Sequence, residues 1–265
     1  MPQNVTVAAL ASEFALWTES DSWEAKLWRT NNASNAGAAF PPAQPKRSLP
    51  MKTDPIRVSK KSKIPAGLPP ELTRIFERKK LFLKFGYDLD REREVILEQA
   101  SPLRGKILEA GTGKGHFASA LAKCGLSFTS FDISKEEKDI AKRYLKFQLL
   151  DGFADLRVEN GEHLSFKDSS YDMIFSINTL HHFTQPHKVL DELIRVLKPQ
   201  GKLILSDFTE KGFKTMDQIH ALEGNVHGRG TITMSETAAY LRRKNFSLQK
   251  TKTLFHQTLI ATKAK

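Results

Sequence analysis

The chain has 265 residues, of which 40% are hydrophobic and 27% are charged, a composition typical of an ordinary soluble globular protein. No uninterrupted apolar run approaches the roughly 20 residues of a membrane span, and the acid-containing start is unlike a secretory signal. The single cysteine, Cys124, excludes an internal disulfide framework and a cysteine-rich zinc site, so a cytoplasmic location is expected.

The positive charge gathers near the N-terminus. The net charge is +11, and residues 46–84 contain 12 Lys and Arg against three acids, so this segment alone carries +9. Such an arm can bind phosphate backbones or anionic lipid. It lacks the interleaved aromatic residues of a single-strand nucleic-acid surface, which favours a solubilising arm. We therefore predict a flexible, basic and Pro-rich leader over residues 1–68.

The remainder, residues 69–265, is predicted to be one α/β domain that begins with two cap helices within residues 69–100. Alternating strands and helices follow. The predicted strands cover residues 106–109, 127–133, 155–160, 171–178, 201–208, 247–252 and 254–262, with helices over 116–124, 134–150, 185–198, 214–223 and 235–244. This alternation indicates a mostly parallel sheet, and ligands of such sheets bind outside the carboxyl ends of the strands.

A glycine-rich loop follows the first of these strands. Residues 109–116 read EAGTGKGH, with glycine at every second position. A triphosphate loop would need glycine at Leu108 and a hydroxyl side chain at Gly115, so Mg-nucleotide binding is not expected. A dinucleotide loop needs a third small residue where His116 stands. The pattern therefore favours another nucleoside cofactor, one without phosphates.

A carboxylate at the end of the second strand strengthens this interpretation. Asp132 lies 23 residues after Glu109, at the next strand's carboxyl end. Its two oxygens can accept hydrogen bonds from both hydroxyls of a ribose, a role incompatible with a 2′-phosphate. Together the loop and Asp132 predict a ribose-and-sulfonium site rather than a phosphate site.

Four segments make the chain resemble the class I S-adenosylmethionine-dependent methyltransferases, in the broad methyltransferase type 11 group that includes ubiquinone and menaquinone C-methyltransferases. They are KILEAGTGKGHFASALA, FDIS, VENGEHLSFKDSSYDMIFSINTLHHF and RVLKPQGKLILSDF, within residues 100–208. The resemblance implies a Rossmann-like, mostly parallel seven-stranded sheet that ends in an antiparallel hairpin. It also implies S-adenosyl-L-methionine as the cofactor.

The resemblance further assigns cofactor contacts residue by residue. They are Glu109, Gly111 and Gly113 at the methionine end, Asp132 at the ribose, Ile133 beside the adenine, Asn160, Gly161 and Glu162 along the adenine edge, and Asn178 under the methionine moiety. Asn160 stands where the family often has Asp, but its side-chain carbonyl can still accept a bond from the adenine amino group.

Two polar groups are candidates for the acceptor side. His181 and His182 follow the fourth strand, where one could act as a general base, with helix capping or packing as the alternative. If residues 220–227 are helical, His220, Glu223 and His227 share one face and could contact an acceptor's polar head. That face could also ligate a metal, or it could be a helix end with ordinary hydrogen bonds, and we assign no metal site.

The acceptor class is narrowed by missing motifs. The fourth strand ends in INTL rather than the N/D-P-P-Y/F tetrapeptide of enzymes that methylate base amines, and Cys124 is placed as a packing residue rather than a nucleophile. We therefore expect methyl transfer to an O-, N- or C-nucleophile of a small molecule. Two alternatives remain: an RNA methyltransferase that uses the basic arm, and a non-catalytic binding protein. A nicotinamide dehydrogenase is a third, more distant alternative.

Overall fold

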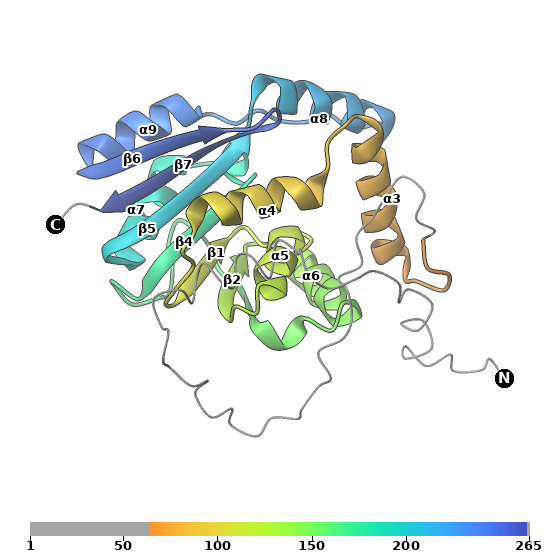
Figure 1. Cartoon of the computed structure of the whole chain (residues 1–265), viewed down its shortest axis with the longest axis horizontal. Coiled ribbons are helices and arrows are strands. Elements are labelled where there is room, and N and C mark those ends of the chain that lie inside the picture. Colours follow the sequence, from red (N-terminus) through yellow and green to blue (C-terminus); the bar gives the residue numbers. More distant parts are fainter. Residues whose placement is uncertain (1–63, 264–265) are drawn as a thin grey trace.

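A seven-stranded sheet forms the centre of the computed structural model, which describes residues 64–263 (Figure 1). The predicted leader lies almost wholly outside these residues, as does the basic arm up to residue 63. Within residues 64–263, no helix has both the length and the apolar character needed to cross a bilayer.

From β1 to β5 strands and helices alternate along the chain, except that β3 is followed by β4 without a helix between them. The strands are β1 (Ile107–Ala110), β2 (Phe128–Asp132), β3 (Ala154–Val158), β4 (Tyr171–Ile177), β5 (Leu197–Phe208), β6 (Phe246–Lys252) and β7 (His256–Lys263). The helices are α3 (Pro70–Lys84), α4 (Leu89–Ala100), α5 (His116–Lys123), α6 (Lys135–Phe147), α7 (Pro186–Val196), α8 (Glu210–Leu222) and α9 (Met234–Arg243), with short 3₁₀ turns η2 (Asp151–Phe153) and η3 (Leu180–His182).

The strand order is β3-β2-β1-β4-β5-β7-β6. Strands β1 to β5 are parallel to one another, and β7 runs antiparallel to both β5 and β6. This confirms the predicted Rossmann-like sheet with an antiparallel hairpin at its end. The order reverses between β1 and β4, so the ends of these strands border the place where a ligand is expected.

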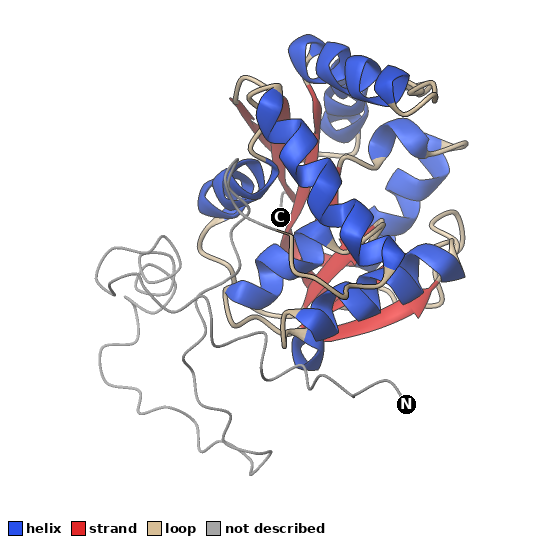
Figure 2. Cartoon of the chain, turned by 90° about the vertical axis from the view of Figure 1, so that its right-hand side faces the viewer, coloured by secondary structure: helices blue, strands red, loops and turns tan. Residues whose placement is uncertain are grey.

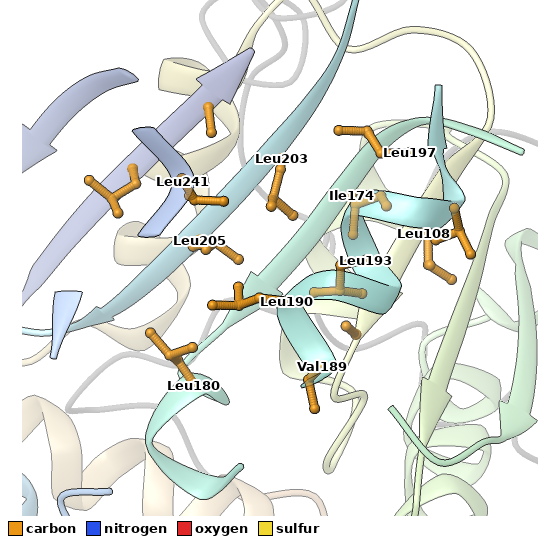
Figure 3. Packing of buried hydrophobic residues seen from close by; sticks show 14 of the residues in the cluster. Leu108, Ile174, Leu180, Val189, Leu190, Leu193, Leu197, Leu203, Leu205 and Leu241 are labelled. Carbon is orange, nitrogen blue, oxygen red and sulfur yellow. The ribbon is translucent and has the colours of Figure 1, made fainter. Parts of the chain in front are cut away.

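Helices cover both faces of the sheet, as the turned view shows (Figure 2). Apolar residues of α4, α5 and α6 pack in one buried cluster, whereas α7 and α9 contribute to another. On the α7 face, Leu190 and Leu193 lie against Ile174 of β4 and Leu205 of β5 (Figure 3). The spacing of the α7 leucines, three residues apart, places them on one helix face.

Leu193 offers a direct test of this core. It is 0% exposed, and Leu193→Ala would leave a cavity that a rigid sheet cannot close. We expect the free energy of unfolding to fall by about 2–5 kcal/mol, measured by urea denaturation. Lys188→Ala, on the exposed side of the same helix, is the matched control. Equal unfolding midpoints for Leu193→Ala and the parent would contradict this packing.

Helices α3 and α8 lie over the carboxyl ends of the strands, at the right and top of Figure 1. One end of α3 packs through Ile75 and Phe76 on α6, and Phe82 near its other end joins α8 residues in a second cluster. The chain thus places two helices around the predicted ligand edge. Both helices contribute polar side chains to this edge.

Ser134 caps α6 by accepting from the Glu137 backbone N–H at 3.1 Å, and a complete capping box lies at α9, between Thr233 and Glu236. Strand β5 begins at Leu197 rather than at the predicted residue 201. Leu197 already pairs with Tyr171, and the strand register shifts between Tyr171 and Met173.

Candidate functional site

The glycine loop bends sharply where β1 ends. Gly111 adopts φ +87°, and a Cβ there would collide with the Thr179 side chain, which follows β4. The backbone N–H groups of Gly111 and Thr112 both donate to the Phe131 carbonyl of β2 at 2.9 Å. Only glycine allows this approach at position 111, so the loop sits between the ends of the two strands that flank β1.

Asp132 lies directly beneath this loop. Its Oδ2 accepts from the Gly113 N–H at 2.8 Å, and its Oδ1 accepts from the Ser134 N–H at 2.9 Å. Each carboxylate oxygen keeps a further lone pair for a ligand. A Cβ built on Gly113 would meet no atom within 4 Å, so the space in front of the loop is open. The predicted ribose residue and the predicted glycine are therefore adjacent.

Apolar and polar groups surround Asp132. Ile133 is 71% exposed, and Val158, the register partner of Asp132 on β3, is also exposed. Asn160 belongs to the next turn, which starts where the Glu159 N–H donates to the Asp132 carbonyl at 3.1 Å. The exposed Ile133 side chain offers a flat, apolar contact next to a polar turn.

The turn at residues 160–163 already uses part of Asn160. Its side-chain Oδ1 accepts from the Glu162 N–H at 3.0 Å, so only the remaining lone pair could receive an adenine amino group. A Cβ on Gly161 would lie 3.3 Å from Val189, which places this glycine against α7. Both residues lie in the same turn, and Gly161 has a packing reason of its own.

Glu109 lies at the buried end of the same region. It is 1% exposed, and its Oε2 accepts from the Ser130 hydroxyl at 2.6 Å. Ser130 in turn contacts the Thr112 hydroxyl at 2.5 Å. Burial raises the pKa of the Glu109 carboxyl to about 8, so the protein holds this group largely uncharged at neutral pH. A cationic ligand group beside it would favour the ionised form.

Asn178 lies just after β4. It adopts φ +56°, and its backbone N–H donates to the Ser206 carbonyl at 2.8 Å. Its side-chain Oδ1 is buried and has no hydrogen-bond partner within residues 64–263. A buried acceptor without a partner is costly, and a ligand's donor would satisfy it.

The histidine pair lies at the carboxyl edge, next to Asp207 at the end of β5. His181 is 5% exposed, and its Nδ1 lies 2.7 Å from Asp207 Oδ1. Its backbone N–H also donates to Asp207 Oδ2, at 3.2 Å. The neighbouring His182 is exposed, with its ring 4.0 Å from the His181 ring. The two histidines therefore differ: one is buried and held, the other is free to turn.

The helix face expected for His220, Glu223 and His227 is only partly formed. Helix α8 ends at Leu222, so His227 lies in the following loop rather than on the helix. Glu223 instead forms an ion pair with Arg78 of α3 at 2.9 Å, and the Arg78 guanidinium also donates to His220 Nε2 at 2.8 Å. The loop nevertheless returns His227 to within 4.7 Å of the His220 ring and 5.1 Å of the His181 ring.

Three functional candidates escaped the sequence analysis: Asp207, Ser130 and Thr112. Asp207 ends a predicted parallel strand, so the rule that ligands meet carboxyl ends would have singled it out. Ser130 lies two residues before Asp132, on the same side of its strand, but a serine in a buried strand carries no pattern of its own. Thr112 lies inside the glycine motif without being required by it.

Residues 108–205 match the family described as Methyltransferase domain. We refer to this part of the chain, which is similar to that family, as the methyltransferase domain. The methyltransferase domain is similar to a demethylmenaquinone methyltransferase of Clavibacter sepedonicus, with 30% identity over 52% of this chain and 56% of that protein. It is also similar to a ubiquinone biosynthesis O-methyltransferase of Coxiella burnetii, with 32% identity over 42% of this chain and 47% of that protein. The chain thus spans about half the length of these relatives.

A solved structure agrees on the fold of the methyltransferase domain. A SAM-dependent methyltransferase from Aquifex aeolicus superposes with a TM-score of 0.54 at 19% identity, covering 70% of this chain and 97% of that one. The cofactor of the family is S-adenosylmethionine. The residues present fit it, because the space at Gly113 is open and the side-chain oxygen of Asn178 is left without a partner.

A separate hollow of about 300 Å³ lies elsewhere in the described part of the chain. It is bordered by Gln99, Ser101, Lys202 and strands β6 and β7, away from the glycine loop. Its lining contains no carboxylate, histidine or cysteine. These residues offer no group suited to proton transfer near neutral pH, so the loop edge remains the candidate site.

Proposed function

We propose that this chain transfers a methyl group from S-adenosylmethionine to an O-, N- or C-nucleophile of a small molecule. One observation carries the proposal: Asp132 is hydrogen-bonded to the Gly113 N–H, so a ribose acceptor and a close-approach backbone form one unit. A 2′-phosphorylated cofactor would be repelled by this carboxylate. The names of the relatives support methyl transfer to small molecules.

The cofactor would lie along the edge formed by the loop and the turns after β2 and β3. Asp132 would accept both ribose hydroxyls, and the exposed Ile133 would contact the adenine. The polar turn at Asn160–Glu162 would border the adenine edge. Asn178 and the buried Glu109 would meet the amino-acid end, where Glu109 supplies a counter-charge for a cation once it is ionised.

The bound cofactor supplies a methyl group on a positively charged sulfur, which is already reactive toward a nucleophile. The chain's own residues then have to orient the acceptor and exclude water. A protonated acceptor must also lose its proton, and His181, held by Asp207, is the candidate to receive it. His182, His220 and His227 would border the acceptor on the same side.

Methyl transfer can be tested with S-adenosylmethionine that carries a radiolabelled methyl group. The protein is incubated with fractionated cell extract, and each fraction is assayed for gained label after small molecules, RNA and protein are separated. We expect label in a small-molecule fraction and none with Asp132→Ala protein. Label in RNA would instead support the basic-arm alternative, and tight cofactor binding without transfer would support a binding protein.

A further inference from the structure

Four of the chain's eight histidines meet at the carboxyl edge of the sheet. His181 and His182 come from η3, His220 from α8, and His227 from the loop after α8. The His227 ring centroid lies 5.1 Å from that of His181 and 6.2 Å from that of His182. Three chain segments thus converge here, although packing alone rarely requires so many imidazoles.

His181 is arranged as a metal ligand is arranged. An ionised Asp207 can only accept, so the short contact at 2.7 Å means that His181 Nδ1 carries the proton. The other ring nitrogen, Nε2, therefore bears a lone pair. It is buried and has no hydrogen-bond partner in the described part of the chain. A carboxylate behind a histidine, with the far nitrogen free, is the usual support of a metal-binding imidazole.

Within the described residues, His227 likewise has a buried ring nitrogen without a hydrogen-bond partner. Its side chain is 6% exposed, and its Nδ1 has no hydrogen-bond partner among residues 64–263. The nearest acid, Asp217, is 3.8 Å away, too far for a hydrogen bond. Two buried imidazoles therefore leave nitrogen atoms unsatisfied within one cluster. An unpaired buried polar atom costs free energy, and a shared ion would satisfy both at once.

The loop that carries His227 is held firmly in place. Arg229 forms ion pairs with Glu210 at 3.1 Å and Asp217 at 2.6 Å, both on α8. Gly230 adopts φ +74°, and its Cα lies so close to the His181 backbone that a Cβ would overlap it. The loop is thus fastened against both α8 and η3, which presents His227 to His181.

We propose that His181, His182 and His227 bind one divalent transition-metal ion of the zinc class. One nitrogen of each lies within 4.8 Å of the others. A tetrahedral zinc site, with Zn–N of about 2.0–2.1 Å, needs nitrogens roughly 3.4 Å apart, so the site must close by more than 1 Å. The exposed His182 can make this movement by rotating its side chain. Cysteine-poor, imidazole-rich sites suit zinc, copper, iron and nickel.

His220 is excluded from the ligand set by its own hydrogen bond. Its Nε2 accepts from Arg78, which as a guanidinium can only donate. Three imidazoles then leave a coordination position open, as catalytic zinc sites do. That position would take water or an oxygen atom of the methyl acceptor. Placing the acceptor there rests on the proposed function, whereas metal binding itself does not. With an ion bound, His181 Nε2 would be a ligand, so His181 would receive the acceptor's proton only in the ion-free protein.

Metal affinity can be measured without the cofactor. Full-length protein made without a polyhistidine tag is stripped with chelator and titrated with Zn²⁺ against a chromophoric competitor. Co²⁺ is titrated in parallel, because its visible absorption reports tetrahedral coordination. We expect one ion per chain. His182→Gln and His227→Gln should each lower the affinity at least about 100-fold, and Asp207→Asn, which acts through His181, about 10–100-fold.

Two further variants sharpen this test. Gly230→Ala removes no ligand but displaces the loop from His181, so it should also weaken binding and the Co²⁺ spectrum. His187→Gln should change neither; His187 is exposed, and its ring centroid lies 4.6 Å from that of Tyr240 of α9. Absence of stoichiometric binding by the parent overturns the proposal. Equal affinity of the parent, His182→Gln and His227→Gln overturns it as well.

Discussion

Replacing Asp132 with alanine is expected to weaken S-adenosylmethionine binding at least about 100-fold. The substitution removes two charge-assisted acceptors for the ribose hydroxyls, each worth roughly 1.5–3 kcal/mol. It also frees the Gly113 and Ser134 N–H groups, which hold the loop and the start of α6 at the cofactor edge. Isothermal titration calorimetry with the parent and variant proteins measures the effect.

The controls separate the ribose contact from damage to the fold. Asp155→Ala removes an exposed carboxylate from the neighbouring strand β3 and should bind like the parent. Asp132→Asn keeps one acceptor oxygen, so its affinity should fall between those of the parent and the alanine variant. Unchanged affinity of a folded Asp132→Ala protein would show that the ribose lies elsewhere.

Glu109→Gln is expected to remove a pH dependence of stability from the ligand-free protein. The pKa of Glu109 is about 8 in the folded state because the carboxyl is buried, and an exposed glutamate ionises near 4.5. Between these values the unfolded chain releases the proton and the folded chain keeps it. The parent therefore loses stability as the pH rises from about 5 to 8, relative to the glutamine variant, by on the order of 3–4 kcal/mol.

Urea denaturation at pH 5, 6, 7 and 8 measures this difference. All other titrating groups are common to the two proteins, so the difference between the curves isolates Glu109. Glu136→Gln, at an exposed position in the first turn of α6, is the matched control and should follow the parent at every pH. Parallel curves for the parent and Glu109→Gln would mean that the carboxyl is not held uncharged.

The sheet could be predicted because each strand is marked by its own short run of neighbouring residues. The runs around Leu108, Ile174 and Leu203 are continuously apolar, as strands buried on both faces require, and glycines mark where they end. The glycine loop and Asp132 were also accessible, because both stand at strand ends whose order along the chain reflects their order in space. These residues carried the cofactor prediction.

The acceptor side was less accessible, because it depends on contacts between distant segments. His181 and Asp207 are 26 residues apart and meet only because β4 and β5 are neighbours. His227 was expected on a helix, yet Gly224 ends α8 and the chain folds back toward η3. The uncharged state of Glu109 likewise depends on total burial, which a pattern of strand residues does not reveal.

Two adjacent residues of α3 form ion pairs with two different parts of the chain. Arg78 reaches Glu223 beyond the end of α8, where both side chains are about a quarter to a third exposed, and Lys79 reaches Asp90 of α4, where the lysine is nearly enclosed. Dissolved salt screens exposed ion pairs far more than enclosed ones. Raising the ionic strength should therefore weaken the Arg78–Glu223 pair more than the Lys79–Asp90 pair, whereas the apolar contact of Phe82 with α8 is not screened and keeps α3 in place.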